Sequence, residues 1–283
     1  MDAGDYAGFS IAIHEPGIAV FTFNQPDRLN GMSVAMKRDL TEALLQAQLD
    51  DSVRVVVFTG SGRAFCAGDD LKAYGTEEGG GARRMPPIPR GHTEPITTYG
   101  ALRGVSQALN RAVRDLDKLS IAAINGVAIQ TGFSLALACD FRIASTTAKL
   151  GSATLRFALL PDEGGQYLLV QHMGAGRAMD FLMRKRIVSA DEALQLGLVG
   201  EVTPPEQLME RTMELARELA DGPQVAMRLL KRSIYNAAHQ TFDQACEDIA
   251  AKTAITDHHR DAREGIRAFK EKRAARFNQP PPK

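Results

Sequence analysis

The run VRVVVFTG at residues 53–60 constrains the fold more than any other segment of the sequence. Its apolar residues follow one another without the polar alternation of a strand that has one face in water, and a glycine loop ends the run. Such a pattern is typical of a strand buried on both faces of a sheet. The sequence therefore predicts a layered α/β fold in which other elements cover both sides of a mostly parallel sheet.

The segments around this strand predict repeated β-β-α units. FSIAIHEPGIAVFTFN at residues 9–24 is rich in β-branched and aromatic residues on both sides of a Glu-Pro-Gly turn, which predicts a hairpin. Ser33 precedes apolar residues at helical spacing and is a good N-cap, so a helix is expected from residue 34 onward. Further strands are expected near residues 121–124 and 141–144, with a short helix of small residues between them.

From about Pro204 onward the pattern is helical, without intervening strands. We therefore expect residues 1–200 to form the β-β-α core and residues 201–283 to form an all-helical extension.

The composition excludes some classes of partner. Lysine plus arginine equals aspartate plus glutamate at 34 each, which does not favour nucleic acid or an anionic membrane as a partner. No apolar stretch reaches the roughly 20 residues that span a bilayer, and the N-terminus lacks the pattern of a signal peptide. We expect a soluble cytoplasmic protein. Three widely spaced cysteines without a CxxC pair predict reduced, buried thiols rather than a metal site.

GRAFCAGDDLKAYG at residues 62–75 follows the strand at residues 53–60. Its glycines and the expected start of a helix at Asp69 and Asp70 would direct backbone N–H groups out of the turn, where they could cradle an anion. Many strand-to-helix loops share this composition, so the motif alone does not decide the function.

The order of several such segments is more specific. FNQPDRLNGMS, GRAFCAGDDLK, INGVAIQTGFSLALACDFRIA, LPDEGG, ADEALQLGLVGEV and EGIRAFKEKR resemble, in sequence and spacing, the crotonase superfamily of enoyl-CoA hydratases and isomerases. The resemblance covers about residues 9–277. It implies a spiral of β-β-α repeats, a helical C-terminal region that mediates homotrimers often paired into homohexamers, and an acyl-CoA substrate whose coenzyme A replaces any separate cofactor.

In this family two backbone N–H groups hold the thioester oxygen as an enolate forms. The matching positions here are Asp69 and Thr131. A backbone donor tolerates any side chain in principle, but Thr131 stands where relatives carry a glycine, which can adopt conformations closed to a β-branched residue.

Hydratases of the family use two glutamates, and the matching positions are Ser134 and Thr154. Hydroxyl groups are not bases near neutral pH, so hydration by two glutamates is not expected. Asp162 in LLPDEGG matches the working carboxylate of some family isomerases and of a related dehalogenase, and we assign it as the base. Alternatively, Asp162 caps the helix that follows. Glu163 is expected to complete the first turn of that helix.

The resemblance also implies residues that bind the substrate. Arg28 would meet the CoA phosphates, or is a solvated turn charge. Ala67 and Leu71 would flank the pantetheine arm. Phe269 and Lys272 would meet the nucleotide from a neighbouring subunit, or serve packing and solubility in an amphipathic helix. The remaining positions assigned to substrate binding are Leu29, Asp70, Gly132 and Thr154.

Other hypotheses remain open at this point. The loop at residues 75–92 could cover the substrate and bring His92 into the site as a second acid or base. The chain could be a hydratase with a rearranged acid-base pair, or a catalytically silent subunit that binds acyl-CoA. Ser134 in GFSLA lacks the second glycine of a serine-hydrolase elbow, which argues against that class.

Overall fold

The computed structural model describes residues 1–70 and 94–279. A seven-stranded sheet forms its centre, with strands in the spatial order β1-β2-β3-β4-β6-β8-β11. β1 to β3 are antiparallel to one another, and β3, β4, β6, β8 and β11 run parallel. The strands are β1 (Gly4–Tyr6), β2 (Phe9–His14), β3 (Ile18–Phe23), β4 (Val55–Gly60), β6 (Leu119–Ile124), β8 (Phe141–Ser145) and β11 (Glu201–Thr203).

A second sheet has the order β10-β9-β7-β5. Its strands are β5 (Ala64–Cys66), β7 (Val127–Ile129), β9 (Lys149–Gly151) and β10 (Ile187–Ser189). The chain alternates between the two sheets and then enters a helix: β4-β5, β6-β7 and β8-β9 each place one strand in each sheet. The predicted spiral of β-β-α repeats is thus confirmed, including the hairpin β2-β3 and the helix that begins after Ser33.

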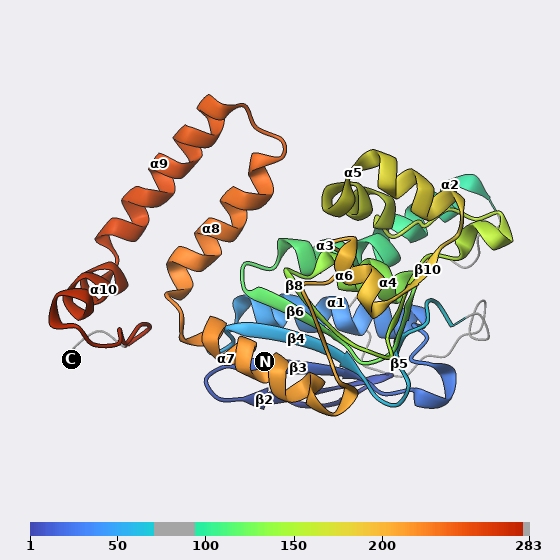
Figure 1. Cartoon of the computed structure of the whole chain (residues 1–283), viewed down its shortest axis with the longest axis horizontal. Coiled ribbons are helices and arrows are strands. Elements are labelled where there is room, and N and C mark those ends of the chain that lie inside the picture. Colours follow the sequence, from blue (N-terminus) through green and yellow to red (C-terminus); the bar gives the residue numbers. More distant parts are fainter. Residues whose placement is uncertain (71–93, 280–283) are drawn as a thin grey trace.

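Helices cover both faces of the large sheet (Figure 1). They are α1 (Val34–Leu49), α2 (Pro95–Ala101), α3 (Gln107–Asp115), α4 (Thr131–Ala138), α5 (Gly165–Met183), α6 (Ala190–Gln195), α7 (Leu208–Asp221), α8 (Gln224–Ala237), α9 (Phe242–His258) and α10 (Arg260–Glu271). Short 3₁₀ turns lie at Pro26–Arg28, Thr154–Phe157 and Pro205–Gln207, and a π-helical turn at Leu102–Ser106 joins α2 to α3.

The apolar strand β4 is buried on both faces, as its sequence predicts. Val55 and Val57 belong to an apolar cluster with Leu219 of α7. Val56 and Phe58 belong to the larger cluster on the opposite face, which α1 and α3 cover. Burial on both sides explains the unbroken apolar run at residues 55–58, and the polar side chain that follows, Thr59, donates its hydroxyl hydrogen to the Ala123 carbonyl at 3.0 Å.

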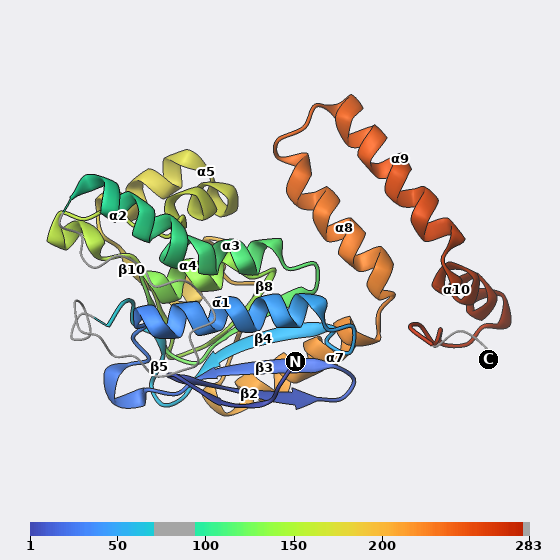
Figure 2. The same cartoon turned by 180° about the vertical axis from the view of Figure 1, so that it is seen from behind.

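The C-terminal helices α8 to α10, here called the arm, project away from the two sheets (Figures 1 and 2). The C-terminal region is helical, although β11, at its start, pairs with β8, and α7 packs on the large sheet. Among the residues of α9, none is buried. Large apolar side chains that are exposed along the arm include Leu230, Ile234, Phe242, Ile249, Ile255, Ile266 and Phe269.

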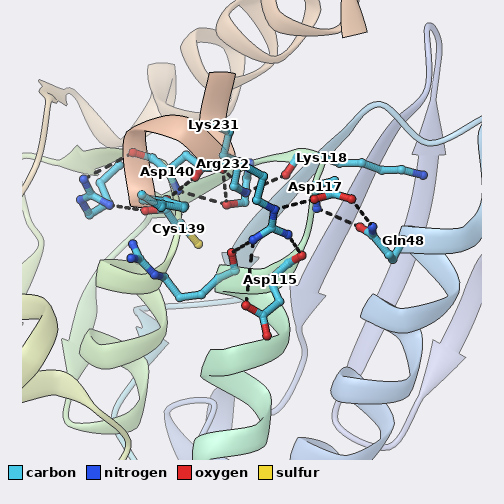
Figure 3. Close-up of polar contacts among 12 residues, drawn as sticks. Gln48, Asp115, Asp117, Lys118, Cys139, Asp140, Lys231 and Arg232 are labelled. Atoms are coloured by element: carbon cyan, nitrogen blue, oxygen red, sulfur yellow. Dashed lines mark hydrogen bonds and ion pairs between the residues drawn. The ribbon is translucent and has the colours of Figure 1, made fainter. Parts of the chain in front are cut away.

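A group of buried polar side chains joins the arm to the core (Figure 3). Asp140 Oδ2 accepts hydrogen bonds from the backbone N–H and the hydroxyl of Ser120 at 2.8 and 2.9 Å, and it lies 2.8 Å from Lys231 Nζ of α8. The Tyr235 hydroxyl donates to Asp140 Oδ1. We call these four residues the anchor cluster, because they fix where α8 leaves the core.

A second contact of α8 lies beside the anchor cluster in Figure 3. Arg232 Nε donates to Asp117 Oδ1 at 2.6 Å, and Gln48 Nε2 of α1 donates to Asp117 Oδ2 at 2.7 Å. Lys118 is fully buried and donates to the backbone carbonyls of Ala47 and Asp50. Charged groups therefore join α8 to the core, and polar contacts continue into the arm, where Lys252 of α9 and Asp248 of the same helix both bond the Ser233 hydroxyl of α8.

The structure bears on the predictions about membrane segments and about the cysteines. No helix in the described ranges is both long and apolar enough to cross a membrane. All three cysteines are free; Cys66 and Cys139 are buried, but Cys246 is exposed, so the prediction that all three are buried is wrong for Cys246. Cys246 lies on α9, a helix without a buried residue.

Candidate active site

The segment after β5 and the start of α4 bring Asp69 and Thr131 together. Met32 N–H donates to the Gly68 carbonyl at 2.9 Å, which holds the segment beside the loop before α1. The Thr131 hydroxyl lies 2.5 Å from Asp69 Oδ1. The backbone N–H groups of Asp69 and Thr131 donate to no acceptor in the described part of the chain. Neither donor is thus used by another residue of these ranges.

Close packing fixes the start of α4. A Cβ at Gly132 would lie 2.2 Å from the Cys66 carbonyl oxygen, so only glycine fits there. Gln130 immediately before α4 has φ 50° and ψ −109°, a conformation that non-glycine residues rarely adopt and that costs on the order of 1–3 kcal/mol. Both polar atoms of its side-chain amide are hydrogen-bonded: Ser152 Oγ donates to Gln130 Oε1 at 2.8 Å, and Gln130 Nε2 donates to Glu163 Oε2 at 2.9 Å.

Glu163 is the most buried carboxylate of this region, with 3% of its surface exposed. Its Oε1 lies 2.6 Å from the Thr131 hydroxyl, and Asn110 Nδ2 donates to its backbone carbonyl at 3.0 Å. Burial, reinforced by the negative charge of Asp162, raises the pKa of Glu163 to about 7. Glu163 therefore does more than complete a helical turn.

Asp162, the predicted base, lies beside Glu163 but is only partly buried. Gln107 Nε2 donates to its backbone carbonyl at 3.0 Å, which fixes the loop. Helix α5 begins at Gly165 with Gly164 as its N-cap and has no side-chain cap, so the alternative role of Asp162 as a cap is not observed. Within residues 1–70 and 94–279, its carboxylate accepts no hydrogen bond.

Lys37 of α1 adds a positive charge that the sequence did not single out. Its side chain is 3% exposed, its Nζ lies 2.7 Å from Asp69 Oδ1, and it donates to Ser106 Oγ at 2.8 Å. Ser106 ends the π-helical turn before α3, a distortion that is frequent at functional sites. We call Lys37, Asp69, Thr131 and Glu163 the site cluster.

The two positions that match the hydratase glutamates lie in different surroundings. Ser134 is 2% exposed, and a Cβ at Gly165 would lie 2.6 Å from its hydroxyl, so this side chain fills the contact between α4 and α5. Thr154 Oγ1 lies 3.2 Å from Ser152 Oγ, which continues through Gln130 to Glu163. Neither position carries a group that could act as a base.

Some of the predicted substrate-binding residues lie in the part of the chain that the structure describes, and others lie outside it. Arg28 Nη1 lies 2.9 Å from Asp70 Oδ2, and the arginine side chain is 45% exposed while that of Asp70 is 5% exposed. Ala67 N–H donates to the Leu29 carbonyl at 3.0 Å, so these two residues are neighbours. Leu71, His92 and the loop at residues 75–92 lie outside the described residues.

Phe269 and Lys272 lie far from the site cluster within one chain. Phe269 is 85% exposed on α10, and Lys272 follows that helix. In both views α10 and β5 lie at opposite ends of the molecule (Figures 1 and 2). Within one chain, Phe269 and Lys272 are therefore not part of the candidate site.

Comparison with known proteins decides the family. The model of the family described as enoyl-CoA hydratase/isomerase matches residues 14–86 and 89–280. The chain belongs to the enoyl-CoA hydratase/isomerase family. Its members are acyl-CoA enzymes, so the predicted class of enzyme and of substrate is confirmed.

Individual relatives agree with this assignment to the enoyl-CoA hydratase/isomerase family. The chain is 35% identical over 272 residues to 1,2-epoxyphenylacetyl-CoA isomerase of Escherichia coli K12, covering 95% of this chain and 98% of the relative. It is 31% identical over 264 residues to crotonyl-CoA hydratase of Syntrophomonas wolfei, covering 93% and 95%. A crystal structure of enoyl-CoA hydratase from Bacillus anthracis superposes with a TM-score of 0.86 at 32% identity, covering 96% and 99% of the chains.

Sequence reasoning missed the connections within the site. Lys37 lies in the first turn of the amphipathic helix α1, where a lysine is normally solvated, and nothing in its local pattern indicates burial. The sequence predicts that Glu163 completes the first turn of α5, whereas its side chain points into the site. The one signal in the sequence is Thr131 at a position where relatives carry glycine. Its added hydroxyl needs hydrogen-bond partners, which the structure shows to be Asp69 and Glu163. No group of side chains suited to a metal ion occurs in the described part of the chain.

Proposed function

We propose that this member of the enoyl-CoA hydratase/isomerase family moves a double bond of an enoyl-CoA thioester by way of a thioester enolate, with Asp162 as the single base. The observation that carries the proposal is the state of the three carboxylates at the site. Asp69 is paired with Lys37, and Glu163 is buried with a raised pKa. Asp162 is left as the partly exposed carboxylate without a hydrogen bond among the described residues.

The reaction needs one base and one oxyanion site. Asp162 removes a proton from carbon 2 of a 3-enoyl thioester, and the electron pair moves into an enolate whose charge rests on the thioester oxygen. The N–H groups of Asp69 and Thr131 donate to that oxygen. The same carboxyl then returns the proton to carbon 4, which leaves the double bond between carbons 2 and 3. No water is consumed.

The substrate residues take their roles from this reaction. Ala67, Leu29 and Gly132 line the approach to the two N–H groups, and Arg28, oriented by Asp70, meets the CoA phosphates. Thr154 lies at the far end of the hydrogen-bond chain through Ser152.

Phe269 and Lys272 would come from a neighbouring copy. The exposed apolar side chains along the arm support assembly into a homotrimer or homohexamer, because a monomer would leave them in water.

The test of this function is whether hydrogen from the solvent enters the acyl chain of the product. Purified protein is incubated in deuterated water with matched 2-enoyl- and 3-enoyl-CoA thioesters, and the products are weighed by mass spectrometry. Double-bond migration with deuterium in the acyl chain and no added water is the expected result. Addition of water to the 2-enoyl substrate would instead support a hydratase with a rearranged acid-base pair.

Asp162→Asn removes the base while keeping the size of the side chain. We expect migration to fall by about 10²–10⁴-fold, the usual contribution of a positioned acid-base group. Asp191→Asn, on the exposed first turn of α6, is the matched control and keeps wild-type activity. Full activity of Asp162→Asn would contradict the assignment. Binding of acyl-CoA without any turnover by the wild type would show a silent binding subunit.

A further inference from the structure

The Thr131 hydroxyl lies between two carboxylates and has one hydrogen to donate. Its oxygen is 2.5 Å from Asp69 Oδ1 and 2.6 Å from Glu163 Oε1. A hydroxyl can donate to only one of these oxygens, and an ionised carboxylate is an acceptor only. The second contact is therefore a hydrogen bond only when one of the two carboxyls carries a proton and donates it to Thr131 Oγ1.

The surroundings decide which carboxyl carries that proton. Lys37 Nζ lies 2.7 Å from the same Asp69 oxygen that faces Thr131, and the Asp69 side chain is 37% exposed. Both features favour negative charge on Asp69. Glu163 is 3% exposed, and a buried carboxyl favours its neutral form. The hydrogen bonds therefore run from Glu163 to Thr131 and from Thr131 to Asp69.

Charged and titratable groups face Glu163 from each neighbouring element. Asp162 lies beside it on the same loop, Asp69 on the segment after β5, and Lys37 on α1. Cys66 on β5 also faces it, but burial raises the pKa of that thiol to about 12, so it is neutral. Two negative charges and one positive charge surround Glu163, which agrees with its raised pKa of about 7.

We propose that Glu163 is a positioning residue that works as a carboxylic acid: through Thr131 it fixes the two residues whose backbone N–H groups hold the thioester oxygen. The inference rests on the proposed function for the identity of that ligand. It also gives a reason for Thr131 at this position, because glycine would leave Glu163 and Asp69 unconnected. When Glu163 loses its proton, two carboxylates compete for one hydrogen, and the start of α4 loses a fixed partner.

Glu163→Gln tests the proposal because an amide reproduces the acid's hydrogen bonds and does not titrate. Its N–H would donate to Thr131 Oγ1, and its oxygen would accept from Gln130 Nε2, as Glu163 Oε2 does now. The rate of double-bond migration, kcat/KM, is measured from about pH 6 to about pH 8 for each enzyme and normalised to its own value at the lower pH.

The wild type and Glu163→Gln should differ in how kcat/KM changes on the alkaline side of the pH profile. A group that titrates near 7 loses about nine tenths of its protonated form between about pH 6 and about pH 8, so wild-type kcat/KM falls about tenfold. In Glu163→Gln this fall is absent. Thr131→Val, which keeps the backbone N–H but removes the hydroxyl, loses activity at every pH, whereas Thr131→Ser retains the wild-type profile.

Two outcomes overturn the proposal. An alkaline limb that persists in Glu163→Gln would assign the titration to another group. A complete loss of activity in folded Glu163→Gln would mean that Glu163 transfers a proton to the substrate rather than holding Thr131.

A measurement without substrate separates this inference from the proposed function. The ordinary pKa of a glutamate is 4.5, and in the folded chain it is about 7, so the folded state binds more protons between these values. Stability from this group is complete below about pH 4.5 and lost as pH rises through about 7. Urea titrations give the folding equilibrium constant of each protein. The ratio of the wild-type constant to that of Glu163→Gln should fall on the order of a hundredfold as pH rises from about 4.5 to about 7. A ratio independent of pH would contradict a protonated Glu163 even if the isomerase activity is confirmed, and the expected ratio with no isomerase activity would refute only the proposed function.

Discussion

The anchor cluster and the site cluster are each built around an acidic side chain with little exposure, Asp140 and Glu163, but they balance charge differently. In the anchor cluster, Asp140 receives a lysine, a tyrosine hydroxyl and two donors from Ser120. In the site cluster, Asp69 and Glu163 face a single hydroxyl that has one hydrogen. The first arrangement has donors for each oxygen of its carboxylate. In the second, Lys37 and Gln130 serve one carboxyl each, but the two contacts at the Thr131 hydroxyl are both hydrogen bonds only with an extra proton.

This difference separates a structural role from a functional one. A buried carboxylate with a full set of donors holds elements in place, and Asp140 does so for the second half of α8, where Lys231 and Tyr235 lie. A cluster that depends on one titrating proton responds to pH near neutrality, which is of use where a reaction moves protons. Substitutions in the two clusters should therefore affect different measurements.

Lys231→Met gives the largest expected effect on stability. It leaves the Asp140 carboxylate buried without its positive partner, where the two side chains are now 11% and 3% exposed. Breaking a buried pair in this way costs about 3–5 kcal/mol of unfolding free energy. Chemical denaturation measures the loss, and Lys270→Met on the exposed side of α10 should change stability by less than about 0.5 kcal/mol. If both variants unfold alike, the anchor cluster has no structural role.

Tyr235→Phe sharpens the comparison with a smaller effect. It removes one donor to Asp140 and keeps the ring, over which the Arg114 guanidinium lies 3.7 Å from the centroid. A hydrogen bond to a charged group contributes about 1.5–3 kcal/mol. The pH dependence of kcat/KM should match the wild type, because the site cluster is intact. A shifted pH profile would show that the two clusters are coupled. Tyr99→Phe, at an exposed position of α2, is the control.

Local pattern predicted the fold well, because each repeat carries its own signals. The apolar run of β4, the Ser33 cap of α1 and the small residues of α4 specify their elements without reference to distant contacts. The order of motifs then placed Asp69, Thr131 and Asp162 in one region, and the structure brings these positions together.

The connections inside the site could not be predicted in this way. Lys37 and Ser106 come from elements far apart in the sequence, and their burial depends on how α1 packs against the turn before α3. Asp162 and Glu163 are adjacent residues that both carry a carboxyl group, and only the direction of each side chain distinguishes the partly exposed one from the buried one. Spacing along the chain carries no information on that direction.

The most direct measurement of the central claim is the infrared spectrum of Glu163 itself. The difference between wild type and Glu163→Gln is recorded as pH rises, with the difference between wild type and Asp140→Asn as the reference. We expect the carbonyl band of a protonated carboxylic acid from Glu163 at about pH 6, replaced by carboxylate bands as pH passes about 7. Carboxylate bands from Glu163 already at about pH 6 would contradict the account.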